Sequence, residues 1–301
     1  MKIALTGATG FVGQAVLDAA SRKGFAVRAL TRRPADPGIG VDWVEGSLED
    51  ADALQRLCEG MDAVVHVAGL TNTPDPREFE TANVTGTRKL MHAAKAVGTQ
   101  RFVFTSSLSA REPSLSLYGG SKARAESHVE TSGLDFTIVR PPAVYGPRDK
   151  DMFDLFRAAK YGLVPVPPRG RTSIIHVTDL AECLLALASA ETVSGATLEP
   201  DDGRDGGYEH SEMARLIGKA VGRKVLAPHL PAPLLHIAAR GDRLLRGKDA
   251  KLTPDRVGYM VHPDWVCRPD RAVPQDIWRP SISGPEGFRA TAAWYEAEGW
   301  L

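Results

Sequence analysis

Short apolar runs alternate with amphipathic stretches through the first half of the chain, and this alternation is what most constrains the fold. Six runs are predicted to be β-strands, at 2–5, 26–30, 41–45, 63–68, 101–105 and 136–139. Segments with a helical period separate them, such as 11–24 and 83–98, and these segments end near glycine. The series predicts an α/β fold of Rossmann type, a doubly wound parallel sheet that binds ligands at the carboxyl ends of its strands.

The rhythm changes at about residue 151. Beyond that point we expect a helix at 151–162, a proline-rich segment at 165–171, and a strand followed by a helix at 173–189. Three further helices are expected at 211–222, 233–245 and 284–299. We therefore expect two domains. A cofactor-binding domain would comprise 1–150 plus 177–200, and a smaller, mostly helical substrate-binding lobe 151–176 plus 201–301.

The glycines at 7, 10 and 13 lie between the first strand and the first helix, in the segment TGATGFVG. Glycine there permits a tight turn, a close approach of the backbone to pyrophosphate, and close packing of helix on strand. The free N–H groups of the helix N-terminus favour an anion. We expect nucleotide binding by Gly7, Thr9, Gly10, Phe11, Val12 and Gly13, with a plain glycine-rich turn as the alternative.

The end of the second strand indicates which nucleotide is bound. A carboxylate about 20 residues beyond the glycines would bind the ribose of NAD, but no acid occurs between Asp18 and Asp36. Arg32 and Arg33 stand there instead, and guanidinium groups suit a 2′-phosphate. NADP is the preferred cofactor, with NAD as the alternative. The competing interpretation is a pair of solvated surface arginines.

The balance of charge argues against large polyanionic partners. Lys plus Arg and Asp plus Glu both number 37, so no overall field favours nucleic acid or a membrane, and neither is an expected partner. Three widely spaced cysteines fit reduced thiols better than a disulfide or a metal site. No run approaches 18 apolar residues, and the N-terminal segment lacks signal-peptide features. We expect a cytoplasmic protein without a metal; a homodimer is compatible with these features.

Tyr118 and Lys122 pose a question that their spacing alone leaves open. They could be ordinary residues of a helix, or an acid and the charge that tunes it. Four positions along a helix put two side chains on one face. The reference pKa of tyrosine is near 10, too high for proton exchange at neutral pH. An ammonium about 4 Å away is worth up to ~4 kcal/mol at an effective dielectric of 20, roughly 3 pKa units.

Several motifs together resemble, in order and spacing, the extended branch of the short-chain dehydrogenase/reductase superfamily. They are TGATGFVG at 6–13, Asn83 in TANVTGT, FVFTSS at 102–107, YGGSK at 118–122, RPPAVYGP at 140–147 and IIHVTDLA at 174–181. The resemblance covers roughly residues 1–185. That branch includes nucleotide-sugar epimerases and dehydratases, dihydroflavonol reductases and 3β-hydroxysteroid dehydrogenases.

The resemblance implies roles for particular residues. Tyr118 would exchange the proton of a carbonyl or carbinol, and Lys122 would also hold the nicotinamide ribose. Ser107, with Ser106 as its rival, would orient the substrate oxygen, and Asn83 would support the lysine through water. Further cofactor contacts are implied for Ser47, Leu48, Ala68, Gly69, Pro141 and Val144. Ser47 departs from the aspartate found in many relatives, which weakens the expected contact with adenine.

Three functions follow as expectations. The first is an NAD(P)-dependent oxidoreductase acting on a ketone, an aldehyde or a secondary alcohol. The second is a nucleotide-sugar epimerase or dehydratase, disfavoured because segment 108–117 is shorter than in the epimerases. The third is a nucleotide-binding regulatory protein without turnover, against which the intact Tyr118 and Lys122 count.

Overall fold

The chain folds into two compact units, each built from three separate segments of the sequence. The computed structural model describes residues 1–33, 40–247 and 250–301. The first unit comprises Met1–Arg140, Leu180–Glu199 and Val273–Arg279, and the second comprises Pro141–Asp179, Pro200–Ala272 and Pro280–Leu301. The residues 141–150 thus group with the second unit and 273–279 with the first. The assignment of the domains to cofactor and substrate binding stays a prediction.

A seven-stranded parallel sheet forms the centre of the first unit, in the order β10-β6-β5-β4-β1-β2-β3. Its strands are β1 (Lys2–Thr6), β2 (Ala26–Thr31), β3 (Val41–Glu45), β4 (Ala63–His66), β5 (Arg101–Thr105), β6 (Asp135–Val139) and β10 (Ala196–Leu198). The predicted doubly wound parallel sheet and its six strands are confirmed. The sequence analysis missed β10, because a three-residue strand shows no clear alternation.

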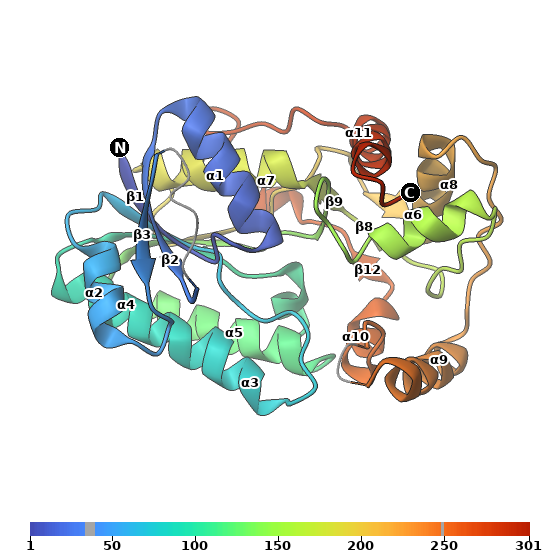
Figure 1. The fold of residues 1–301 in the computed structure, drawn as a ribbon, viewed down its shortest axis with the longest axis horizontal. Helices are drawn as coiled ribbons and strands as arrows, with labels where there is room; N and C mark the ends of the chain where they lie inside the picture. Colours follow the sequence, from blue (N-terminus) through green and yellow to red (C-terminus); the bar gives the residue numbers. More distant parts are fainter. Residues whose placement is uncertain (34–39, 248–249) are drawn as a thin grey trace. The chain divides into compact units, whose positions relative to one another are not determined.

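Helices cover both faces of this sheet (Figure 1). They are α1 (Phe11–Lys23), α2 (Ala51–Cys58), α3 (Arg77–Phe79), α4 (Gly86–Ala96), α5 (Leu117–Glu130) and α7 (Val177–Ser189). On one face, buried residues of α2, α4 and α5 such as Leu54, Leu90 and Ala125 share a core with Phe102 and Phe104 of β5. On the other face α1 and α7 lie together, and ion pairs join Arg22 and Lys23 at the end of α1 to Glu182 in the middle of α7.

The second unit is mostly helical, as expected. Its helices are α6 (Phe153–Lys160), α8 (His210–Ala220), α9 (Ala232–Arg246), α10 (Pro254–Met260) and α11 (Gly284–Ala297). Its strands are β7 (Ala143–Tyr145), β8 (Arg171–Thr172), β9 (Ile174–His176), β11 (Tyr208–Glu209) and β12 (Asp264–Trp265). Buried aromatic rings, among them Tyr145, Phe156 and Phe288, fill the core between α6, α8 and α11.

Asp179 lies near the start of the helix that follows β9, but it does not precede that helix as an N-cap residue would. Helix α7 begins at Val177, so Asp179 lies in its first turn. Its buried carboxylate instead accepts hydrogen bonds from the backbone N–H and hydroxyl of Ser281 and from the N–H of Ile282, at 2.7–3.0 Å. The residue therefore fixes the segment that leads into α11.

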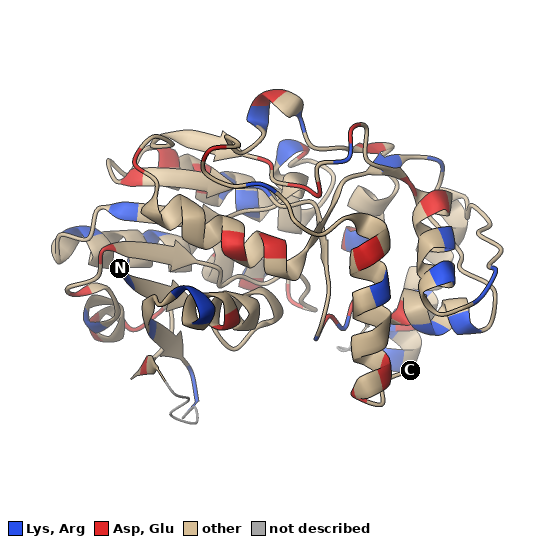
Figure 2. Cartoon of the chain, turned by 90° about the horizontal axis from the view of Figure 1, so that it is seen from above, with Lys and Arg blue, Asp and Glu red and all other residues tan. Residues whose placement is uncertain are grey.

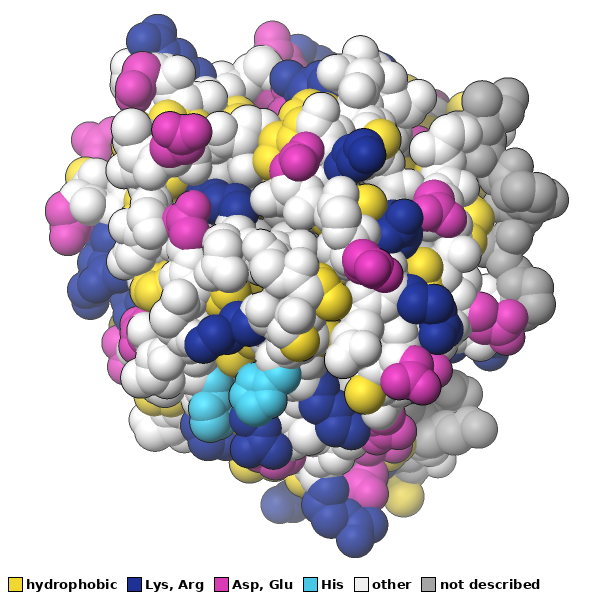
Figure 3. All heavy atoms as spheres, turned by 90° about the vertical axis from the view of Figure 1, so that its left-hand side faces the viewer, with side chains coloured by type: hydrophobic (Ala, Val, Ile, Leu, Met, Phe, Trp, Pro, Cys, Tyr) yellow, Lys and Arg dark blue, Asp and Glu magenta, His cyan; other side chains and the backbone are white. Residues whose placement is uncertain are grey.

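Charged side chains of both signs are interspersed along the elements (Figure 2). The face shown in Figure 3 likewise mixes basic and acidic side chains, and hydrophobic atoms form only small separate areas there. Among the described residues, no helix combines the length and apolarity needed to cross a membrane.

Candidate active site

The glycine-rich turn joins β1 to α1 in a way that only glycine permits. Gly7 has φ +76°, and a Cβ there would lie 2.7 Å from the backbone nitrogen of Ala68. A Cβ on Gly13 would lie 2.0 Å from the carbonyl oxygen of Gly7, so α1 packs directly on the turn. Gly10 precedes the helix without a side-chain cap, which leaves the first N–H groups of α1 available to an anion. Thr9 lies in this turn, and Phe11 and Val12 are the first two residues of α1.

Arg32 and Arg33 follow β2 directly, and both are exposed. The hydroxyl of Thr31 donates to the carbonyl oxygen of Arg33 at 2.7 Å, which folds the chain back at the end of the strand. Since β2 is next to β1 in the sheet, the two guanidinium groups and the glycine turn stand at the carboxyl ends of neighbouring strands.

The carboxyl ends of β3 and β4 supply the next candidate residues. Ser47 follows β3, and its hydroxyl accepts from the N–H of Glu49 at 3.1 Å. Leu48 packs over Gly86, where a Cβ would lie 2.8 Å from its side chain. Ala68 donates its N–H to the hydroxyl of Thr6 at 3.2 Å, which ties the end of β4 to β1.

Gly69 lies where the sheet edge meets α5. A Cβ at this position would lie 3.0 Å from Oδ1 of Asn83 and 3.6 Å from Nζ of Lys122. The backbone of Gly69 and these two side chains are therefore brought together.

Lys122 is buried, and its ammonium donates to the carbonyl oxygen of Thr105 at 2.7 Å, the last residue of β5. It also lies 4.4 Å from the centre of the Phe104 ring. Desolvation lowers the pKa of Lys122 to about 8, against the opposing influence of the Glu126 carboxylate. The lysine is still mostly protonated at neutral pH, so it can act as a positive charge near a phenol.

Tyr118 lies in the first turn of α5, four residues before Lys122. Ser116 caps this helix and accepts from the N–H of Gly119 at 2.9 Å, which fixes the turn that carries the tyrosine. The ring of Tyr118 is half-buried, 6.1 Å from that of Phe79. Tyr118 and Lys122 therefore lie one turn apart on the same helix.

The structure distinguishes the two candidate serines. Ser106 is buried, and its hydroxyl donates to the carboxylate of Glu126. Ser107 is half-buried at the start of a 3₁₀ turn (Leu108–Arg111), where its hydroxyl accepts from the N–H of Ser109 and from the Ser109 hydroxyl. A hydroxyl engaged with a buried carboxylate is poorly placed to meet a substrate, so this geometry favours Ser107 for that role.

Asn83 lies in η1 (Glu80–Thr85), a π-helical turn that runs into α4. Its side-chain oxygen accepts from the N–H of Leu70 at 2.8 Å, and its amide donates to the carbonyl oxygen of Leu70 and the hydroxyl of Ser121, both at 2.9 Å. Asn83 thus joins the segment after β4 to α5. Such π-turns occur often at functional sites.

A buried charge cluster behind the site was not predicted. Glu126 lies one turn beyond Lys122 and accepts two hydrogen bonds from Arg140, at 2.9 and 2.6 Å. The carboxylate oxygens of Glu199, which is also buried, lie 3.8 Å from guanidinium nitrogens of both Arg140 and Arg111. The spacing of Lys122 and Glu126 was the available signal, but Arg140 and Glu199 are too distant in sequence to be paired with it by spacing.

The remaining candidates, Pro141 and Val144, belong to the second unit, where Val144 lies in β7 and pairs with Ile175 of β9. Within the described ranges, no group of three or more His, Cys, Asp or Glu residues could hold a metal ion.

Comparisons with known proteins agree with this geometry. Residues 7–191 match a family model described as NAD(P)H-binding. The chain is 37% identical over 311 residues to a ceramide reductase of Caulobacter vibrioides, covering 99% of this chain and 96% of the relative. It is 34% identical over 175 residues to the sterol demethylase protein B of Methylococcus capsulatus, covering 50% and 53% of the two chains. The crystal structure of gox2253 has the same fold, with a TM-score of 0.78, 24% identity and coverage of 100% and 99%.

Proposed function

The chain belongs to the extended branch of the short-chain dehydrogenase/reductase superfamily, and from this we propose that it is an NADP-dependent reductase of a carbonyl group on a long-chain, lipid-like molecule. The observation that carries the substrate class is the 37% identity to a ceramide reductase along 99% of the chain. That similarity includes the second unit, the predicted substrate-binding lobe. The shorter match to a sterol demethylase protein also points to a lipid.

The glycine turn fits a dinucleotide, because Gly7 and Gly13 let the turn, α1 and the Ala68 backbone pack closely, and the uncapped N–H groups at the start of α1 remain available to a pyrophosphate. When bound, the nicotinamide ring supplies a hydride to the carbonyl carbon. Tyr118 donates its phenolic proton to the carbonyl oxygen, which gives the alcohol and leaves a tyrosinate. Lys122 stabilises that anion until a proton from solvent restores the phenol, and the hydroxyl of Ser107 orients the carbonyl oxygen.

The preference for NADP rests on the two arginines after β2. Arg32 and Arg33 are exposed at the carboxyl end of a strand adjacent to β1, and a guanidinium group there can meet a 2′-phosphate in a bidentate manner. We keep a homodimer and a cytoplasmic location as further proposals, which sedimentation velocity and cell fractionation would test.

The decisive experiment follows NADPH oxidation with a ceramide bearing a ketone in its long-chain base, a keto-steroid and UDP-glucose as separate substrates. We expect turnover with the first. Tyr118→Phe should lower that turnover by about 10²- to 10⁴-fold while the protein still binds NADPH, since only the acid is removed. Tyr161→Phe is the matched control, because this tyrosine is 87% exposed and lies outside α5.

Other outcomes would replace the proposal. Conversion of UDP-glucose without net consumption of cofactor would identify an epimerase, whereas binding of NADPH without turnover of any substrate would support the regulatory alternative. Full activity of Tyr118→Phe on the keto lipid would remove the assigned acid.

A further inference from the structure

Helix α9 carries an apolar surface that the second unit does not cover. Leu244 and Leu245 are each 88% exposed, Ile237 is 62% exposed and Leu234 is 50% exposed. Large apolar side chains exposed singly are common, but four on one 15-residue helix call for an explanation.

These four side chains form a continuous stripe. At about 100° per residue, Leu234, Ile237, Leu244 and Leu245 fall within about 120° of the helix circumference. The small residues Ala238 and Gly241 lie between them on the same stripe. The buried residues Leu235 and Ala239 point away from the stripe, into a cluster with Val257 of α10. The helix therefore has two apolar faces, one packed and one open.

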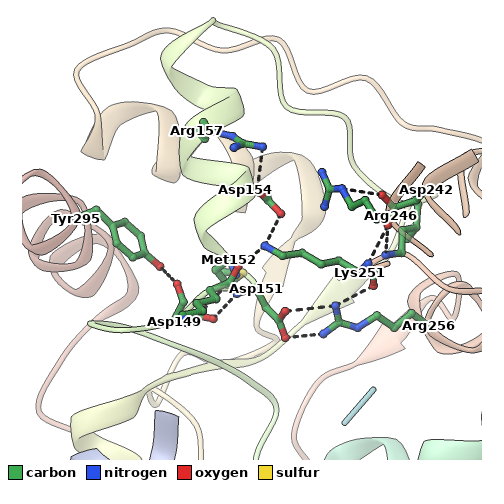
Figure 4. Close-up of polar contacts among 12 residues, drawn as sticks. Asp149, Asp151, Met152, Asp154, Arg157, Asp242, Arg246, Lys251, Arg256 and Tyr295 are labelled. Atoms are coloured by element: carbon green, nitrogen blue, oxygen red, sulfur yellow. Dashed lines mark hydrogen bonds and ion pairs between the residues drawn. The ribbon is translucent and has the colours of Figure 1, made fainter. Parts of the chain in front are cut away.

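The open stripe has a cationic edge. Arg240 is exposed and, at 100° per residue, lies about 40° from Leu244 on one flank of the stripe. The exposed Arg243 lies about 100° from Leu244, nearer the packed face at Ala239. The only acid in the helix, Asp242, is turned toward the body of the unit (Figure 4). Its carboxylate accepts from the N–H groups of Lys251 and Leu252 at 2.8 and 2.9 Å. The structure describes every residue of α9, and its outward surface thus combines apolar side chains with positive charge and presents no carboxylate.

The polar contacts in Figure 4 tie α9, through Asp242, to the residues that follow it, and tie these residues and α10 to α6 and the turn before it. Arg246 lies 3.1 Å from Asp242, and the ammonium of Lys251, just beyond α9, lies 2.7 Å from Asp154 of α6. Arg256 of α10 pairs with Asp151 at 2.6 Å in the same region. The stripe therefore faces outward from an ordered helix that is anchored through its other side.

We propose that α9 docks in the plane of an anionic lipid surface, with its apolar stripe at the acyl boundary and Arg240 against the lipid phosphates. A helix that lies in a membrane interface has this combination of an apolar stripe and basic residues. Charge complementarity favours a lipid over a second copy of the chain, because an antiparallel symmetric dimer through this stripe would place the two copies of Arg240 on the same side of the contact, with no carboxylate of α9 to pair with them. The balanced net charge of the chain argued against a membrane partner. The net charge, however, does not show how charged and apolar side chains are distributed on a single helix.

The test measures co-sedimentation of the full chain with phosphatidylcholine vesicles that either contain or lack phosphatidylglycerol. We expect binding to the anionic vesicles that weakens as salt increases. Leu244→Ala combined with Leu245→Ala should reduce the partition coefficient at least ~10-fold. Arg240→Gln should reduce it by about fivefold, and only on the anionic vesicles.

Matched controls lie outside the helix. Leu226→Ala removes an apolar side chain that is 74% exposed, and Arg223→Gln combined with Lys224→Gln removes two exposed charges; each should leave binding within ~2-fold of wild type. Absence of wild-type binding to either vesicle would overturn the proposal, as would equal losses in the controls. An oligomer that dissociates in the leucine variant, with vesicle binding unchanged, would identify a second copy as the occupant instead. No substrate is involved, so this result is independent of the proposed reduction.

Discussion

Lys122 must carry a positive charge for the proposed chemistry, yet it is buried, where a positive charge is unfavourable. Its charge serves the proposed chemistry, but burial of the ammonium lowers its pKa to about 8 from 10.5. The folded protein then binds this proton more weakly than the unfolded chain does. The cost to stability is therefore fully present below pH 8, and it disappears as pH rises from about 8 to about 10.5.

Replacing Lys122 with methionine should accordingly separate stability from function. We expect the melting temperature of the cofactor-free protein at pH 7 to rise, because the buried charge is removed, whereas NADPH affinity and turnover should both fall. Thermal melts and a fluorescence titration with NADPH measure the two effects. Lys160→Met, on the exposed side of α6, is the control. A melting temperature lower than that of this control would show that the ammonium stabilises the fold.

The arginines after β2 make a prediction about cofactor choice. Arg32→Ala combined with Arg33→Ala should weaken NADPH binding by ~1.5 to 3 kcal/mol for each charge-assisted hydrogen bond that the variant can no longer form, because the 2′-phosphate then has no guanidinium partner there. Binding of NADH, which lacks that phosphate, should hardly change and serves as the internal control. Equal reductions in affinity for the two cofactors, measured by calorimetric titration, would mean that these guanidinium groups are ordinary surface residues.

At the scale of single elements, the turn before α6 contains a buried carboxyl group, that of Asp149. Asp149 is buried, and its carboxylate accepts from the N–H of Asp151 at 2.8 Å and from that of Met152 at 3.3 Å, just before the helix begins (Figure 4). Desolvation raises the pKa of Asp149 to about 6, against these two hydrogen bonds. The folded protein thus holds this proton more tightly than the unfolded chain.

The sign of the resulting pH dependence follows. The contribution of Asp149 to the free energy of unfolding should fall as pH rises from about 4 to about 6, by up to ~3 kcal/mol. Asp149→Asn cannot ionise, so its stability relative to wild type should increase over that range in urea unfolding at several pH values. The exposed Asp205→Asn is the control. A constant difference between variant and wild type would contradict a raised pKa.

For the whole molecule, local signals in the sequence were enough for six of the seven strands of the sheet and for the glycine-rich turn. The periodicity of each run located six strands, and the spacing of Gly7, Gly10 and Gly13 located the turn, because these features depend on neighbouring residues. The pairing of Glu126 with Arg140, the edge strand β10 and the inward turn of Asp242 depend on contacts between distant segments. No single sequence contains that information in a local pattern.

The path of the chain has a consequence for its synthesis. The chain passes between the two units five times, and the first unit recruits segments as late as Val273–Arg279. After β6 leaves the ribosome, one of its edges stays unpaired until β10, the strand that pairs with it, has been synthesised. At ~5–20 residues per second this interval lasts roughly 3–12 s, during which an unpaired strand edge is exposed. A nascent chain stalled between the two strands would therefore be the form most in need of a chaperone.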